Sequence, residues 1–206
     1  MSDRILSAVE QYYSEKLRRF GPTPKGVDWK DLASQNLRFD QLCRLVKTVP
    51  DATINEVGCG YGSFLEYLRQ QCHRGAYCGI DLSAKMIEAA LARHGNDPRA
   101  RFCVGSVPPE PMDFAVSSGI FNVRLDISTA DWEDYIRDTL DAMNKACREG
   151  LAFNCLTSYS DPEYMRDDLY YGDPCYWFDY CKNQLSGKVN LHQGYGHYEN
   201  EIISLI

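Results

Sequence analysis

Apolar runs of strand length alternate with amphipathic runs of helix length between residues 53 and 159, and this alternation constrains the fold more than any other feature. Strands that alternate with helices form parallel sheets, and right-handed crossovers make such sheets doubly wound. The predicted fold class is therefore α/β, with a doubly wound, mostly parallel sheet. The predicted strands span residues 53–58, 76–82, 100–107, 112–121 and 151–159, and the predicted helices 61–72, 84–95 and 130–150.

The two ends of the chain carry a different pattern. Apolar residues at helical spacing predict helices over 4–19 and 30–48, and the segment FGPTPKG between them contains two prolines and two glycines that break a helix. Near the other end, residues 188–195 and 201–206 have the pattern of a terminal hairpin. We therefore expect an N-terminal helical lid over residues 1–50 and a domain over 51–206 that ends in a C-terminal antiparallel hairpin.

Charge and composition exclude several classes of function. The formal net charge is -7, and an acidic chain repels a phosphate backbone, so a nucleic-acid partner is not expected. No apolar run approaches the roughly 20 residues that span a bilayer, and the charged first residues do not resemble a signal peptide, so a cytoplasmic protein is expected. Nine cysteines without a CxxC pair indicate reduced core residues and no metal site.

A glycine-rich loop after the first predicted strand points to a ligand site. Gly58, Gly60 and Gly62 open the following helix, and Asp81 ends the next strand. In open α/β sheets, ligands bind at the carboxyl ends of the strands, where glycines allow close approach and a carboxylate accepts the two hydroxyls of a ribose. The third glycine comes one residue too early for a dinucleotide fingerprint, which argues against NAD or FAD. The other interpretation is a purely structural turn with a helix cap.

These motifs resemble those of class I S-adenosylmethionine (SAM)-dependent methyltransferases, and in particular of a group of small bacterial members. The resemblance rests first on EVGCGYG at 56–62 and GIDLS at 79–83. It extends over nearly the whole chain, through GVDW at 26–29, SSGIFNVR at 117–124, AFN at 152–154 and WFDYCK at 177–182. It implies a Rossmann-like fold, a SAM-binding domain over residues 51–206, and SAM as the substrate or co-substrate.

The resemblance also implies roles for individual residues around SAM. The loop Gly58-Cys59-Gly60 would pass under its methionyl and ribose parts, and Asp81 would bind the ribose hydroxyls. Farther along the strand ends, four residues would contact the remaining groups: Leu82 and Met86 the faces of the adenine, Ser106 its edge, and Ser117 the methionyl end near the reacting centre.

Two polar residues of the second predicted helix are candidates for binding the same ligand. Gln35 and Arg38 are three residues apart and share a helix face. The planar guanidinium of Arg38 suits the methionyl carboxylate, although a solvated helix charge would explain it equally well.

Candidate catalytic residues come from the later part of the chain. Asn154 is polar within the apolar run LAFNCL, so its amide must bond either the backbone or a ligand. Tyr176 belongs to one of two clusters of aromatic residues expected to cover the reacting carbon, with core packing as the other explanation. Ser204 lies in the terminal strand, where the sequence departs from the family pattern. The two aromatic clusters comprise Tyr12, Tyr13, Phe20 and Trp29, and Tyr170, Tyr171, Tyr176, Trp177, Phe178 and Tyr180.

Three functions remain open at this level. The first is a methyltransferase that acts on a small-molecule acceptor, either amino-acid-like or a natural product. The second, on resemblance to azetidine-2-carboxylate synthases, is cyclisation of SAM itself, in which its amino group attacks its γ-carbon and methylthioadenosine leaves. The third is a SAM-binding module without catalysis. The sequence leaves the acceptor and the oligomeric state open.

Overall fold

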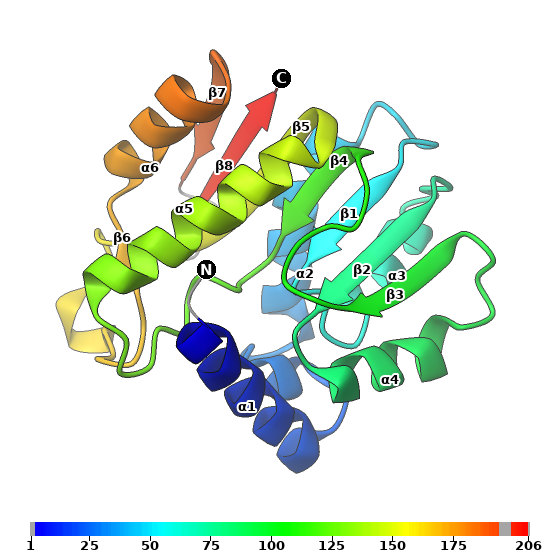
Figure 1. Cartoon of the computed structure of the whole chain (residues 1–206), viewed down its shortest axis with the longest axis horizontal. Helices are drawn as coiled ribbons and strands as arrows, with labels where there is room; N and C mark the ends of the chain where they lie inside the picture. The colour runs from blue at the N-terminus through cyan, green and yellow to red at the C-terminus, as the bar shows by residue number, and fades with distance from the viewer. Residues whose placement is uncertain (1–2, 194–198, 206) are drawn as a thin grey trace.

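The computed structural model describes residues 3–193 and 199–205, which form an α/β fold around one mixed sheet (Figure 1). The sheet order is β3-β2-β1-β4-β5-β8-β7, and β6 pairs with the end of β5. The first five strands are mutually parallel, which confirms the predicted parallel sheet. The strands are β1 (Ile54–Val57), β2 (Tyr77–Asp81), β3 (Ala100–Val104), β4 (Met112–Ser117), β5 (Cys147–Thr157), β6 (Tyr171–Gly172), β7 (Lys188–His192) and β8 (Glu199–Leu205).

The last two strands differ in direction from the rest. β8 pairs antiparallel with β5 on one side and with β7 on the other, so it is inserted between two strands that run with the parallel set. The backbone of Ser204 pairs with Leu151 and Val189 in this arrangement.

Helices cover both faces of the sheet (Figure 1). In Figure 1, α5 crosses in front of the sheet, while α2 and α3 lie behind it. An ion pair between Arg93 and Glu66 joins α4 to α3. The α-helices are α1 (Asp3–Phe20), α2 (Leu32–Leu42), α3 (Ser63–Gln70), α4 (Ala84–His94), α5 (Thr129–Lys145) and α6 (Pro174–Tyr180), with short turns η1 (Pro24–Val27), η2 (Cys43–Leu45), η3 (Pro162–Tyr164) and η4 (Cys181–Leu185).

Alternation of side chains along the strands divides the apolar core into two main layers. On β1, Ile54 packs with the cluster of α2 and α3, whereas Val57 packs with the cluster of α1, α5 and α6. The first 50 residues contribute to both layers, for example Val9 on one side and Phe39 on the other. The predicted boundary at residue 50 therefore marks a change in secondary-structure pattern and does not separate two cores.

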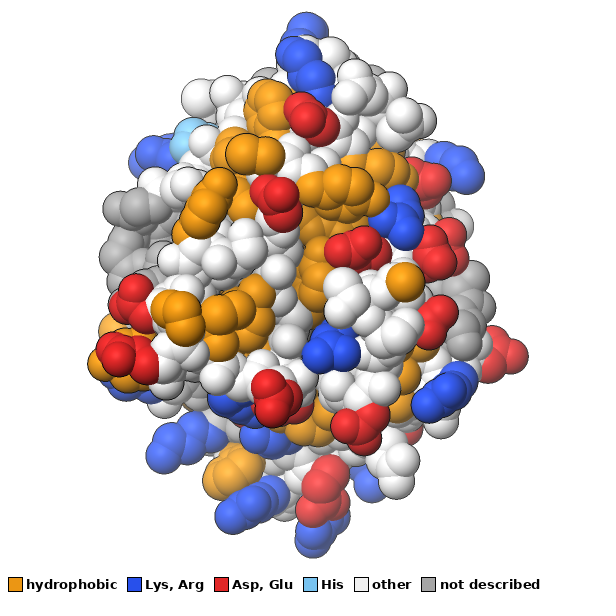
Figure 2. All heavy atoms as spheres, turned by 90° about the vertical axis from the view of Figure 1, so that its left-hand side faces the viewer, with side chains coloured by type: hydrophobic (Ala, Val, Ile, Leu, Met, Phe, Trp, Pro, Cys, Tyr) orange, Lys and Arg blue, Asp and Glu red, His pale blue; other side chains and the backbone are white. Residues whose placement is uncertain are grey.

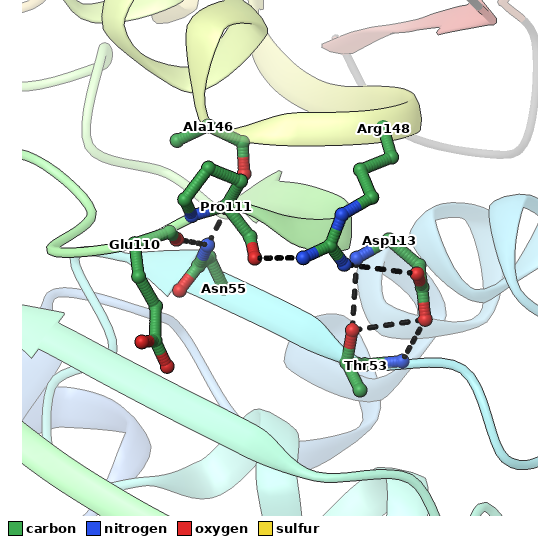
Figure 3. Close-up of polar contacts among 7 residues, drawn as sticks. All are labelled: Thr53, Asn55, Glu110, Pro111, Asp113, Ala146 and Arg148. Atoms are coloured by element: carbon green, nitrogen blue, oxygen red, sulfur yellow. Dashed lines mark hydrogen bonds and ion pairs between the residues drawn. The ribbon is translucent and has the colours of Figure 1, made fainter.

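Hydrogen bonds between side chains and backbone tie together the amino-terminal ends of the central strands (Figure 3). The Asn55 amide donates to the carbonyl oxygens of Glu110 and Ala146, and Arg148 donates to Pro111 and Asp113. Asp113 also accepts from the backbone N–H and the hydroxyl of Thr53, both within 3 Å. These contacts join β1, β4 and β5 at this end of the sheet, whereas open space lies at the carboxyl ends.

Several predicted elements are longer than the observed ones, and the contacts and backbone angles at their ends explain the difference. The predicted helix over 130–150 ends at Lys145 because Cys147 already pairs with Met112 as the first residue of β5. The predicted helix over 30–48 begins after Asp31, whose carboxylate caps the N–H of Ser34, and it passes into a short 3₁₀ turn at Cys43. The predicted strand over 112–121 ends at Ser117, before a positive φ of 79° at Gly119.

Candidate active site

A cavity, called here the main cavity, lies at the carboxyl ends of β1, β2 and β4. Its empty space is about 800 Å³, part of it open to solvent. The walls come from the glycine loop and from Asp81 below, and from Glu10 and Tyr13 of α1 and Trp29 above. Residues far apart in the sequence thus close one space over the strand ends, the position expected for a ligand in this class of fold.

The glycine loop leaves room for that space by its backbone conformation. Gly58 and Gly60 have φ values of 78° and 53°, in a region that other residues rarely adopt. A Cβ atom at Gly58 would lie 2.0 Å from Cγ2 of Ile120, which also lines the main cavity. A side chain at this position would therefore strain the loop and displace a wall residue.

The Asp81 carboxylate is oriented by backbone donors. The N–H of Gly60 donates to Oδ2 at 2.8 Å, and the N–H of Ser83 donates to Oδ1 at 2.9 Å. Burial nevertheless raises the pKa of Asp81 to about 6, because the charged form loses solvation. Each oxygen keeps a further lone pair, so the carboxylate at neutral pH offers two acceptors to a ligand in the main cavity.

A second carboxyl group, that of Glu56, lies in the floor of the same cavity. Its side chain is 2% exposed, and it accepts a hydrogen bond from the hydroxyl of Tyr77. Burial raises the pKa of Glu56 to about 8, which makes the neutral acid the main form at pH 7. A cationic ligand in the main cavity would favour the carboxylate and release this proton.

Glu56 predicts a specific dependence of stability on pH. Its pKa is raised from 4.5 to about 8, so the folded state binds more protons than the unfolded state between these values. The free energy of unfolding contributed by this group is therefore present below pH 4.5 and is lost as pH rises to about 8, by at most about 1.4 kcal/mol per pH unit. Urea titrations at pH 5, 6, 7 and 8 should show a flatter profile for Glu56→Gln than for the wild type. Glu88→Gln, at an exposed carboxylate of α4, is the control, and identical profiles for the wild type and Glu56→Gln would contradict the assignment.

Buried polar atoms at the end of β4 and on β5 lack partners. Within the described residues, no hydrogen bond is made by the hydroxyls of Ser117 and Ser118 or by Nδ2 of Asn154. The other end of the Asn154 amide is engaged, since its Oδ1 accepts the N–H of Gly119 at 2.7 Å. Buried polar groups are normally paired, so this group of atoms fits a polar ligand at the end of β4. Ser118 itself lines the main cavity.

Most of the predicted ligand-binding residues meet in this one place. Gln35 reaches it from α2, where its amide donates to the hydroxyl of Ser63 at 3.1 Å. Ser117 is fully buried at the end of β4, directly before the cavity residue Ser118. The predicted residues in the wall of the main cavity are Gln35, Gly58, Cys59, Gly60, Asp81, Leu82, Met86 and Ser106.

The structure does not bring Arg38 into the main cavity. Its guanidinium lies 4.2 Å from the ring centroid of Trp29, and one of its nitrogens donates to the carbonyl and hydroxyl oxygens of Ser34. The side chain lines a separate cavity that also contacts Trp29. The structure thus places Arg38 behind the indole of Trp29, and its pairing with the methionyl carboxylate stays a prediction.

Tyr176 is also displaced from the expected position. It is 40% exposed, its hydroxyl accepts a hydrogen bond from Arg137 of α5, and it does not line the main cavity. This side of the molecule shows apolar side chains interspersed with charged ones (Figure 2). The structure thus places Tyr176 against α5 and solvent, and its catalytic role stays a prediction.

Three other residues of the second aromatic cluster make contacts in the core or with α5. Trp177 is fully buried and donates to the hydroxyl of Tyr170, and Tyr180 donates to Asp141 of α5. Trp177 and Tyr170 belong to the core layer beneath α5. Of the first aromatic cluster, Tyr13 and Trp29 line the main cavity. Tyr13 and Trp29 are thus placed where an aromatic residue could cover the site, whereas Trp177 and Tyr170 follow the other explanation, core packing.

The structure describes the side chain of Asn154 but only the backbone of Ser204, the other two predicted catalytic residues. Asn154 is 1% exposed and holds the amide of Gly119, a residue of the cavity wall, so its observed contact is with the loop. The backbone of Ser204 pairs with Leu151, three residues before Asn154 and so farther from the carboxyl end of β5. The side chain of Ser204 lies outside what the structure describes.

Three wall residues have no role predicted from the sequence: Glu56, Glu10 and Tyr135. Glu56 had a detectable signal, because a carboxylate inside an apolar strand next to the glycine loop requires a partner. Glu10 and Tyr135 had none, since each has the helical spacing of ordinary surface or core residues.

Comparison with known proteins decides the family. A sequence profile described as a methyltransferase domain matches residues 55–150. A protein of Mycobacterium tuberculosis (strain ATCC 25618 / H37Rv) that carries a provisional methyltransferase name is 46% identical over 160 residues, which cover 78% of this chain and 96% of that protein. The chain belongs to the methyltransferase family. The profile covers the glycine loop, Asp81 and β4, which are the parts that form the floor of the main cavity in this methyltransferase.

Solved methyltransferase structures share the fold at low sequence identity. The N-methyltransferase NodS from Bradyrhizobium japonicum, in complex with S-adenosylhomocysteine, is 17% identical with a TM-score of 0.69, covering 96% of this chain and 97% of that one. Magnesium protoporphyrin IX methyltransferase from Synechocystis, with the same product bound, is 12% identical with a TM-score of 0.68, covering 97% and 98%. These likenesses establish a class I Rossmann-like methyltransferase fold over nearly the full length.

Two further observations concern metal ligands and membrane-spanning helices. Among residues 3–193 and 199–205, no group of three or more His, Cys, Asp or Glu side chains is arranged to hold a metal ion. A search of the same residues finds no helix that is both long and apolar enough to cross a membrane.

Proposed function

We propose that this methyltransferase binds SAM in the main cavity and transfers its methyl group to a small-molecule acceptor. The observation that carries the proposal is the convergence, at one strand edge, of the glycine loop, the oriented carboxylate of Asp81 and the unpartnered hydroxyls of Ser117 and Ser118. A ribose needs paired acceptors, and a zwitterionic amino acid needs hydroxyl and backbone partners. The residues present therefore fit the group.

Different residues of the cavity wall bind different parts of SAM. Asp81 accepts the ribose hydroxyls, while Leu82 and Met86 enclose the adenine and Ser106 bonds its edge. The loop from Gly58 to Gly60 supports the ribose and the methionyl chain through its backbone. Ser117, Ser118 and Gln35 lie toward the methionyl end, with Glu56 beneath it as a carboxyl group that can match an ammonium.

The chemistry needs positioning more than proton transfer. When bound, SAM supplies a methyl group on a positively charged sulfur, an activated leaving group. A lone pair of the acceptor forms the new bond to the methyl carbon as the carbon–sulfur electron pair returns to sulfur, and the acceptor proton passes to solvent. Tyr13 and Trp29 exclude water from this point, and their rings favour a nearby cation. The protein thus contributes alignment and a dry, cation-tolerant enclosure.

The N-terminal segment acts as the lid in this proposal. α1 reaches over the strand ends, where the Ser14 and Ser83 hydroxyls lie 2.6 Å apart, and it places Glu10 and Tyr13 in the wall. Trp29 follows η1 and completes the cover. Because both α1 and α2 share core layers with the rest of the chain, the lid is anchored at Val9 and Phe39.

The test is incubation of the purified protein with SAM, first alone and then with a panel of amino-acid and aromatic acceptors, with products identified by mass spectrometry against an enzyme-free blank. We expect S-adenosylhomocysteine to form above the blank only when an acceptor is present. Methylthioadenosine from SAM alone, with a matching cyclic four-carbon amino acid, would replace the proposal by internal cyclisation. Binding of SAM without either product would instead indicate a sensor.

A further inference from the structure

A second cavity adjoins the main cavity and shares a wall with it. Its empty space is about 580 Å³, including open solvent, and Tyr13, Val27, Trp29 and Gly119 line both spaces. The Trp29 ring lies directly on the backbone after β4, because a Cβ at Gly119 would be only 2.4 Å from its Cζ2 atom. Gly119 is thus the residue that allows an indole to form the common wall.

The second cavity is positively charged, in contrast to the acidic chain around it. Its lining contains Lys30, Arg38 and Arg166 but only one acidic residue, Asp28. Both oxygens of Asp28 are engaged from outside the lining, by the hydroxyl of Tyr12 at 2.7 Å and by the ammonium of Lys16 at 2.5 Å. The charge of Asp28 is therefore balanced by Lys16, and Asp168 pairs with Arg166. Together these side chains comprise four cations and two carboxylates, so their formal charge is positive, while the whole chain carries a net charge of -7.

Two of these cations are held in position by their neighbours. Arg38 is 7% exposed, stacks on Trp29 and bonds Ser34, so its charge is fixed close to the shared wall. Arg166 is more open, but Nε and Nη2 of its guanidinium are both bonded to Asp168. Lys30, an exposed residue just before α2, is the third cation. Leu156 and Trp29 add apolar surface to the same lining, and Trp29 also lines the main cavity.

We propose that this second cavity is the acceptor site and that it selects an anionic acceptor, a carboxylate with an apolar body. The carboxylate is held near Lys30 and Arg166, and the apolar body lies against Trp29 and Leu156, so that the group to be methylated faces the main cavity past Gly119. This inference rests on the proposed function, because it requires the methyl donor in the main cavity.

The test uses three probes of one shape and different charge: benzoate, benzamide and benzylammonium. Each is titrated by calorimetry into the full-length protein, with and without saturating S-adenosylhomocysteine. We expect benzoate to bind at least tenfold more tightly than the other two probes. The double variant Lys30→Gln/Arg166→Gln should weaken benzoate about fivefold to tenfold, as expected for charged contacts at a partly exposed site, and leave the affinity for S-adenosylhomocysteine unchanged.

Lys25→Gln is the matched control, since Lys25 is an exposed cation of η1 outside the second cavity. It should bind benzoate as the wild type does. Equal or tighter binding of benzylammonium, no binding of benzoate, or full benzoate affinity in the double variant would each overturn the anionic acceptor site. Failure of S-adenosylhomocysteine to bind would count separately, against the proposed function, because the probes are also titrated in its absence.

Discussion

Replacement of Asp81 by asparagine is expected to weaken SAM binding by about 100-fold or more, with little change in fold. Each hydrogen bond from a ribose hydroxyl to a carboxylate contributes about 1.5–3 kcal/mol, and both depend on acceptor oxygens that Asp81 offers. The variant keeps the size of the side chain, but its amide nitrogen would face the N–H of either Gly60 or Ser83, which now donate to the two oxygens. Calorimetric titration with SAM measures the loss.

Asp113→Asn is the matched control for this experiment. Asp113 also accepts hydrogen bonds from a backbone N–H and from other groups, but at the amino-terminal end of the sheet (Figure 3). Its substitution should lower the free energy of unfolding and leave the affinity for SAM within about twofold, well below the change that one lost hydrogen bond produces. Wild-type affinity in Asp81→Asn, or an equal loss in both variants, would refute the ribose assignment.

The SAM affinity of the wild-type protein should also depend on pH, because it requires the ionised carboxylate of Asp81. Because burial raises the pKa of Asp81 to about 6, the carboxylate that accepts two hydroxyls is lost as pH falls below this value. Glu56 is present in both proteins, so the ratio of SAM affinities between the wild type and Asp81→Asn isolates the contribution of Asp81. This ratio should be constant above about pH 7 and fall at lower pH. A ratio that does not change with pH would show that the ionised form is not required.

Replacement of Gly58 by alanine should damage both stability and binding. The backbone there has a φ of 78°, and a left-handed conformation costs an L-residue with a Cβ about 1–2 kcal/mol. The added methyl would also lie 2.0 Å from Ile120, so this side chain, which lines the main cavity, must move. We expect a loss of about 1–3 kcal/mol in the free energy of unfolding and at least a tenfold loss in SAM affinity.

Gly187→Ala provides the comparison, because a Cβ at Gly187 would meet no heavy atom within 4 Å. Its free energy of unfolding should stay within about 0.5 kcal/mol of the wild type, as for most surface substitutions, and its SAM affinity should be unchanged. Urea unfolding and calorimetry on the two variants separate strain from a general effect of losing a glycine. Normal SAM binding in Gly58→Ala would show that the loop is not in contact with the ligand.

The central sheet was predictable because its signal is local. Runs such as INEV of β1 and MDFAV of β4 are short, apolar and separated by helical patterns, and only a parallel sheet accommodates that order. The ends of elements were less predictable. The sequence around Cys147 continues a helical pattern, but pairing with Met112 makes this residue part of β5. Contacts between distant residues thus override the local preference at the boundaries.

The site residues at the strand ends were predictable for the same reason, whereas the residues that cover the main cavity were not. Gly58, Gly60 and Asp81 follow their strands directly in the sequence, so their position at the strand ends is fixed once the strands are known. The aromatic residues that cover the site have no such constraint. Trp29 reaches the main cavity while Tyr176 points to Arg137 and solvent, although both occur in clusters of similar composition.

By itself, the sequence determined a parallel α/β sheet with a ligand loop at its carboxyl edge, because strand periodicity, glycines and a strand-end carboxylate act over a few neighbouring residues. Only the tertiary structure decided which side chains surround that loop: Tyr13 and Trp29 entered the wall, and Arg38 moved to the far side of the indole. Those positions depend on how α1 and α2 pack into the two core layers. Such packing depends on complementary shapes of residues far apart in the chain, and no local pattern encodes it.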